Sequence, residues 1–174
     1  MAFAVASSRS DDSAAIFTVG QGVRVPSELM TDQQRRTLTV SGATDQLYLL
    51  GRNGDHAYYR AGGADGGTCY AVGNDSVLLE VGCLKPGREM PTALIDMSVV
   101  AIAPSAPSSP RLVAVEGIAA DQVSSVGIER EDGSLVTVRP GNSYRFAPDA
   151  IPSDPVAIVA LDESGAVIQR KTLG

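Results

Sequence analysis

The chain of 174 residues has no tryptophan, and aromatic side chains make up only 5% of it. Valine, isoleucine, leucine and alanine must therefore fill most of a core, and the β-branched side chains among them pack well on the pleated surface of a sheet. With 44% hydrophobic and 20% charged residues, the composition is that of a folded protein and excludes disorder of the chain as a whole. A chain of this length buries enough surface for a stable core without a metal.

Positive charge and long apolar runs are also scarce. The 14 lysines and arginines are outnumbered by 20 acidic residues, so the formal net charge is −6. Nucleic-acid binding needs clustered Lys and Arg, so we expect no nucleic-acid partner. No apolar run reaches the roughly 18 residues of a membrane span, so we expect no span in this chain. Residues 1–9 resemble the outer end of an export or anchor segment, so a missing upstream anchor and a frayed N-terminal arm both stay open.

Two cysteines, Cys69 and Cys83, flank a segment with turn residues. Zinc needs four ligands, which two cysteines and one histidine do not supply, and a redox dithiol is normally C-x-x-C. Adjacent strands of a hairpin hold facing Cα atoms about 5.5 Å apart, within the reach of a disulfide. We predict a structural disulfide between Cys69 and Cys83, with two buried free thiols as the alternative. A disulfide would mean that the fold matures outside the cytosol.

No catalytic set accompanies the cysteines. His56 is the only histidine, so any Ser-His-Asp scheme would have to use it as the base. It follows a predicted turn, so we expect it to lie exposed at the shoulder of a hairpin. The chain has no G-x-S-x-G nucleophile elbow, and its glycine-rich stretch at 62–67 has no following G-K-[ST]. We therefore predict no catalytic residue, no metal site and no cofactor.

The pattern of strands predicts an all-β fold. Asn53-Gly54 between β-type runs at 47–51 and 57–61 predicts a hairpin with a type I′ turn. Two runs at 69–72 and 77–83 follow, and apolar alternation over 94–103 predicts a further strand. Short strands at regular spacing are typical of a β-sandwich, and we predict them over 111–119, 123–130, 134–139, 143–147, 155–162 and 166–172. Pro26 and the capping-box spacing of Thr31 and Gln34 predict one short helix near 26–36.

These elements predict four regions along the chain. Residues 1–13 form a disordered arm, and residues 14–103 form an antiparallel meander stapled by Cys69–Cys83. A Pro- and Ser-rich seam at 104–110 follows, because its prolines block regular pairing. Residues 111–174 then form an immunoglobulin-like β-sandwich half, which is too small to be stable alone and is expected to pack on the first half.

Two further groups of residues could serve binding. Tyr58 and Tyr59 are neighbours on a predicted strand, so we expect one to be buried and one to point outward. An outward tyrosine would anchor a binding patch, although ordinary cross-strand packing explains the same residues. Turn acids normally accept hydrogen bonds from the local backbone, and we expect this of Asp65, Asn74, Asp75, Asp132 and Asp162.

A series of turn and strand segments resembles a group of uncharacterised, predicted exported or membrane-anchored proteins of high-GC Gram-positive bacteria. The likeness covers roughly residues 45–172 and is carried by the segments 47–52, 59–60, 67–73, 82–83, 95–100, 115–121 and 160–167. The resemblance implies a β-rich protein of the cell envelope and implies no activity. The N-terminal membrane segment usual in that group is absent from this sequence.

The sequence therefore predicts a non-catalytic structural or binding module outside the cytoplasm. It would be extracellular or part of the cell envelope, anchored to the membrane if a longer form exists, with an unidentified protein or glycan of the envelope as partner. Two alternatives stay open. One is a small hydrolase that uses His56 as base, and the other is a secreted binding or inhibitor protein that acts through Tyr58, Tyr59 and the glycine-rich loops.

Overall fold

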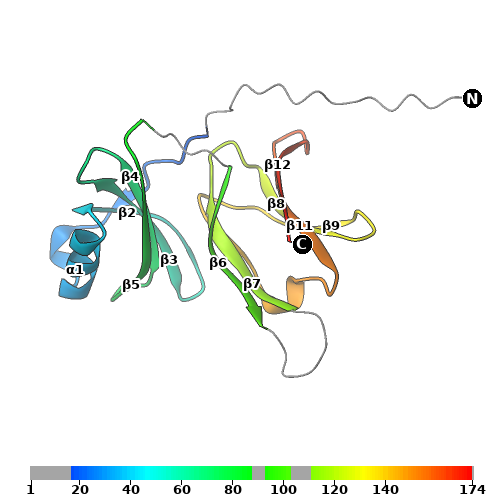
Figure 1. Cartoon of the computed structure of the whole chain (residues 1–174), viewed down its shortest axis with the longest axis horizontal. Helices are drawn as coiled ribbons and strands as arrows, with labels where there is room; N and C mark the ends of the chain where they lie inside the picture. Colours follow the sequence, from blue (N-terminus) through cyan, green and yellow to red (C-terminus); the bar gives the residue numbers. More distant parts are fainter. Residues whose placement is uncertain (1–16, 88–92, 103–110, 174) are drawn as a thin grey trace, which may run out of the picture.

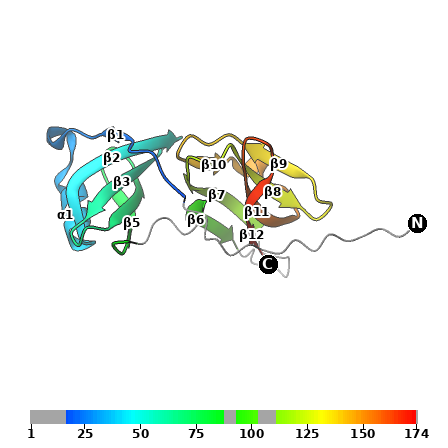
Figure 2. The same cartoon turned by 90° about the horizontal axis from the view of Figure 1, so that it is seen from above.

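A computed structural model describes residues 17–87, 93–102 and 111–173. The fold is all-β with one short α-helix, as predicted, and it has two halves that lie side by side (Figures 1 and 2). The predicted arm at 1–13 and the predicted seam at 104–110 lie outside the described residues.

The first half is an antiparallel meander, also as predicted. Its five strands follow one another in the sheet in chain order. They are β1 (Val23–Arg24), β2 (Ala43–Asn53), β3 (His56–Gly63), β4 (Thr68–Gly73) and β5 (Leu78–Leu84). One face of this sheet is covered by the helix α1 (Asp32–Val40), which follows the 3₁₀ turn η1 (Ser27–Leu29).

The helix begins where the capping box predicts. The Thr31 hydroxyl accepts a hydrogen bond from the Gln34 backbone N–H at 3.2 Å, and the Gln34 side chain accepts one from the Thr31 N–H at 3.0 Å. Two orphan N–H groups of the helix start are satisfied in this way. The predicted range began too early, because Pro26 precedes the 3₁₀ turn and not the α-helix itself.

The turn of the β2–β3 hairpin differs in type from the prediction. β2 extends through Asn53, so the two central residues of the turn are Gly54 and Asp55. Only Gly54 has a positive φ, of 61°, and no residue other than glycine has one among the described residues. Glycine at the first central position with positive φ is the pattern of a type II′ turn and not of type I′.

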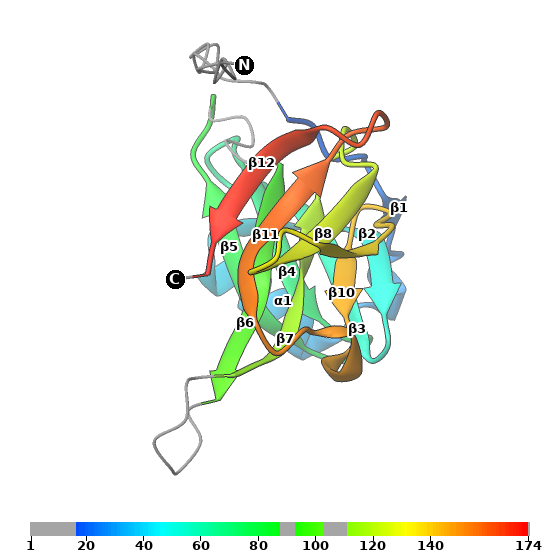
Figure 3. The ribbon, with the colours of Figure 1, turned by 90° about the vertical axis from the view of Figure 1, so that its right-hand side faces the viewer.

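The second half consists of two antiparallel sheets (Figure 3). One has the order β10-β7-β6 and the other β12-β11-β8-β9. Their strands are β6 (Leu94–Ile102), β7 (Arg111–Ala119), β8 (Ser125–Arg130), β9 (Leu135–Val138), β10 (Tyr144–Phe146), β11 (Pro155–Leu161) and β12 (Val167–Thr172), with the 3₁₀ turn η2 (Pro148–Ala150) after β10. The immunoglobulin-like assignment of this half stays a prediction.

The predicted boundary between the halves is wrong. β6 was expected to belong to the first region, but it pairs with β7 from Leu94↔Ala119 to Ile102↔Arg111 and so belongs to the second half. The halves therefore meet between β5 and β6, before the seam and not at it. Proline and serine prevent pairing within a segment, but they do not show whether the strands on either side pair with each other.

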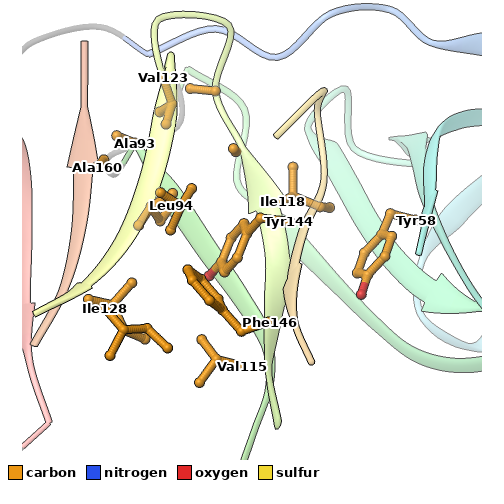
Figure 4. Close-up of a cluster of buried hydrophobic side chains, with 14 of the residues drawn as sticks. Tyr58, Ala93, Leu94, Val115, Ile118, Val123, Ile128, Tyr144, Phe146 and Ala160 are labelled. Atoms are coloured by element: carbon orange, nitrogen blue, oxygen red, sulfur yellow. The ribbon is translucent and has the colours of Figure 1, made fainter. Parts of the chain in front are cut away.

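The two halves share one hydrophobic core. Tyr58, Tyr70 and Val72 of the first sheet join a cluster whose other buried members come from the second half. Figure 4 shows Tyr58 on the first sheet, facing this cluster. A separate core, with Leu38, Leu47 and Tyr59, fills the space between the first sheet and the helix. The central strands β3 and β4 of the first sheet are thus largely buried on both faces.

Candidate functional site

The disulfide lies at the position predicted for it. Cys69 of β4 and Cys83 of β5 are direct partners in the sheet and are bonded, with Cα atoms 4.0 Å apart. This spacing is shorter than the value of about 5.5 Å expected from the sequence. Neither cysteine is free. The bridge holds the edge strand β5 to the sheet.

The predicted binding patch at Tyr58 and Tyr59 is wrong. Tyr58 is 0% exposed and Tyr59 is 2% exposed. The two side chains do point to opposite faces of β3, but the second half covers one face and the helix covers the other. The prediction failed because it assumed that one face of the sheet meets solvent.

A polar cluster at the interface of the two halves is centred on Glu116 of β7, which is 2% exposed. Its carboxylate accepts a hydrogen bond of 2.6 Å from the Tyr58 hydroxyl and lies 2.7 Å from Nδ1 of His56. The Arg145 Nε lies 3.7 Å from the same carboxylate. A buried carboxylate is stable only when it is paired and hydrogen-bonded, and these three side chains supply that pairing.

The tip of the β2–β3 hairpin completes this contact (Figure 2). The Asn53 side chain donates to the Ser143 hydroxyl at 3.1 Å, and Arg145 donates to the Asn53 carbonyl oxygen at 3.0 Å. The turn requires glycine at residue 54 for its positive φ, and a Cβ there would lie 2.9 Å from the Arg145 guanidinium, which would have to shift. We call Asn53, His56, Tyr58, Glu116, Ser143 and Arg145 the hairpin network.

The hairpin network contains one half of a catalytic arrangement. A carboxylate that orients a histidine is the base–orienter pair of hydrolases, and the His56 side chain is 31% exposed, so solvent reaches it. His56 is therefore not isolated on the hairpin tip, contrary to the expectation from sequence. Among the described residues, its ring is bonded to Glu116 and to no serine or cysteine. The arrangement orients the ring and, in this geometry, joins the two halves.

Glu116 and Arg145 were not predicted as site residues from the sequence. A signal for Glu116 was present, because it is the one charged residue between Val113 and Ala120, in an otherwise apolar run. A charge within a buried strand needs a partner. Nothing local to the sequence indicates that this partner would be the hairpin of the other half.

Because of Tyr58, the free energy of unfolding is expected to fall at alkaline pH. Burial, and then the hydrogen bond to Glu116, raise the pKa of Tyr58 above its ordinary value. An unfolded tyrosine ionises near pH 10, so this stabilisation is complete below about pH 10 and is lost as the pH rises further. Burial raises the pKa of Tyr59 and Tyr70 in the same sense.

We therefore expect the free energy of unfolding to fall between about pH 9 and about pH 11, and to fall less steeply in the variant Tyr58→Phe. Urea unfolding at the two pH values measures both slopes. Equal slopes in the wild type and the variant would show that Tyr58 does not carry this pH dependence.

The turn acids behave as expected. Asp65 accepts from the Gly67 N–H at 3.0 Å, Asp132 from the Ser134 N–H at 2.8 Å and Asp162 from the Ser164 and Ala166 N–H groups. Asn74 accepts from the Ser76 and Val77 N–H groups. Asp75 differs, because it pairs with Arg52. Hydrogen bonds from the Ser134 side chain and then from its N–H lower the pKa of Asp132, and those from the Ser164 hydroxyl and then from the Ala166 N–H lower the pKa of Asp162. No cluster that could hold a metal ion occurs among the residues that the structure describes.

Polar side chains line two of the hollows on the surface of the described residues. One, of about 600 Å³, lies over the ends of β2, β3 and β4 and is lined by Tyr48 and Arg60. The other, of about 580 Å³, lies in the second half beside Asp121, Arg139 and Asp162. Tyr48 lines the first of these hollows, and the buried Tyr59 lines a further, more apolar hollow together with Val25 and Leu49.

No family model, no curated protein and no solved structure matches this chain. The resemblance to exported proteins of high-GC Gram-positive bacteria therefore stays a prediction. Within the described ranges, no helix is long and apolar enough to cross a membrane.

Proposed function

We propose that this protein is a non-catalytic binding or structural module that works outside the cytoplasm, at the cell envelope. The observation that carries the proposal is the disulfide between Cys69 and Cys83. Disulfides persist in secreted and envelope proteins and are rare in the reducing cytosol. The partner is a protein or a glycan of the envelope.

The rigidity of the fold supports a binding role. Three devices hold its parts in place, namely the disulfide at β5, the hairpin network between the halves and the core that both halves share. A rigid scaffold loses little conformational entropy when it binds, so its surface hollows are suited to recognition.

A second candidate is a small hydrolase. The contact of 2.7 Å between His56 and the buried Glu116 favours it, because it matches the base–orienter half of a triad. The other half, a hydroxyl or thiol nucleophile on the His56 ring, is lacking among the hydrogen bonds of the described residues. The binding role is therefore preferred.

Two measurements on the purified, disulfide-intact protein separate these candidates. We expect it to sediment with isolated envelopes of a high-GC Gram-positive bacterium, and to hydrolyse p-nitrophenyl acetate no faster than the variant His56→Gln. Protein that stays in the supernatant would contradict the binding role. Hydrolysis above the background that is lost in His56→Gln would establish the hydrolase instead.

A further inference from the structure

The hollow over the first sheet is shaped by a bulge in β2. The pairing of β2 with β3 shifts between Ala43 and Leu47, where β2 has more residues than its partner. The residues that the bulge displaces, Thr44, Asp45 and Gln46, line the hollow. Bulges often redirect side chains beside functional sites. The hydroxyl of Thr44, the carboxylate of Asp45 and the amide of Gln46 thus come from three consecutive residues of the bulge.

The hollow is also lined by Arg60, whose guanidinium pairs with no carboxylate among the described residues. Tyr48, Arg60 and Tyr70 are direct neighbours across β2, β3 and β4, and the first two line the hollow. Arg60 is partly buried, and among the described residues it has no hydrogen bond and no ion pair with a carboxylate, although it interacts electrostatically with the neighbouring Tyr70. An unpaired guanidinium keeps its fork of donors available for an anionic group.

One part of the lining leaves no space for a larger side chain. It is formed by Gly66, Gly67 and Thr68, and a Cβ at Gly67 would lie 2.1 Å from the Leu84 carbonyl oxygen, so no side chain fits there. Thr68 precedes Cys69, whose disulfide to Cys83 holds this end of β4 to β5. The hollow is therefore preformed, and glycine leaves it room.

These groups match the chemistry of an acidic sugar. A sugar ring has an apolar face of C–H groups that packs on an aromatic ring, and hydroxyl groups around its edge that bond to amides, hydroxyls and carboxylates. Tyr48 offers the ring, and Thr44, Asp45, Gln46 and Thr68 offer the polar partners. The unpaired Arg60 favours a negatively charged group. A sugar carboxylate supplies that charge and accepts two hydrogen bonds from the guanidinium.

We propose that this hollow binds a saccharide that carries a carboxylate, with the carboxylate on Arg60 and a sugar ring against Tyr48. The inference rests on the proposed binding role and names its ligand class. A peptide with a free C-terminal carboxylate is the other class that an arginine attracts, and its binding is an outcome of the test below.

The test is isothermal titration calorimetry on the disulfide-intact full chain. The probes are a hyaluronan tetrasaccharide and a trigalacturonate, both of which carry carboxylates. The control probe is chitotetraose, which keeps the N-acetylglucosamine units and lacks the carboxylate. We expect both acidic probes to bind, and chitotetraose to bind at least about ten-fold more weakly, because a charge-assisted hydrogen bond contributes roughly that factor.

Matched variants assign the binding to this hollow. Arg60→Gln and Tyr48→Ala should each weaken the binding of the hyaluronan tetrasaccharide about ten-fold, while Tyr48→Phe, which keeps the ring, should bind nearly as the wild type does. Arg139→Gln, an exposed arginine beside the other hollow, is the charge control and should have no effect. Unchanged melting temperatures show that each variant is folded.

Three results would overturn the inference. The first is wild-type affinity in a folded Arg60→Gln variant, and the second is an equal loss in Arg139→Gln. The third is Arg60-dependent binding of an acetylated tripeptide with no binding of the acidic saccharides. If the protein sediments with envelopes but binds neither saccharide, the ligand class is wrong and the binding role stands. If it does neither, both proposals fail.

Discussion

Replacing Glu116 with alanine is expected to lower the free energy of unfolding by about 3 kcal/mol, because removing one partner of a buried ionic network leaves the others uncompensated. The Tyr58 hydroxyl is buried and would lose its acceptor, Arg145 would lose its counter-charge, and His56 would lose its hydrogen-bond partner. Urea unfolding near neutral pH, followed by circular dichroism, measures the change.

The matched control is Glu129→Ala. Glu129 also pairs with an arginine, Arg170, at 2.7 Å, but both side chains are partly exposed. Exposed ion pairs contribute at most about 1 kcal/mol, so this variant should be nearly as stable as the wild type. If Glu116→Ala is destabilised no more than Glu129→Ala, the hairpin network does not hold the halves together.

A double-mutant cycle isolates the central contact of the network. Tyr58→Phe removes the hydroxyl and keeps the packed ring, so a cycle with Glu116→Gln measures the coupling between the two side chains. We expect a coupling of about 1 kcal/mol or more, as is usual for groups in one hydrogen-bond network. Additive effects would mean that the contact of 2.6 Å contributes nothing specific.

Breaking the disulfide is expected to lower the free energy of unfolding by about 3 kcal/mol, because the bridge closes a loop of about fifteen residues in the unfolded chain. The variant Cys83→Ala breaks the bridge and leaves the buried Cys69 in its packing site. Its urea midpoint should therefore fall, and a reducing agent should lower the midpoint of the wild type to a similar value without affecting the variant. A midpoint that reduction does not change would show that the bridge adds no stability.

The strands were predictable because their pattern is local. Turn residues interrupt short apolar runs at regular intervals, and the strand predicted over 111–119 coincides with β7 (Arg111–Ala119). The disulfide followed from the same pattern, since a hairpin brings Cys69 opposite Cys83. The capping box at Thr31 placed the helix, because its two hydrogen bonds span only three residues.

The errors concern contacts between distant segments. The seam at 104–110 was interpreted as a boundary although the strands on either side of it pair with each other. One of Tyr58 and Tyr59 was expected at a surface, although the second half covers the first and the helix α1 covers the second. In both cases local composition describes the segment but carries no information about what packs on it.

The candidate sites were the least predictable part. The hairpin network joins His56 to Glu116, sixty residues apart in the chain, and no spacing rule connects such positions. The hollow at Tyr48 and Arg60 depends on a bulge in β2, which the sequence does not mark with a glycine at residues 44–46. Both sites arise from how the strands pair and how the halves meet.

The redox state of the cysteines in the native compartment tests the central claim most directly. Cells that make the protein are lysed in acid, the protein is denatured and alkylated without a reducing agent, and its mass is measured. The account predicts that Cys69 and Cys83 take up no alkyl group and that the protein is recovered from the envelope or the medium. Recovery from the cytoplasm with both cysteines alkylated would contradict it.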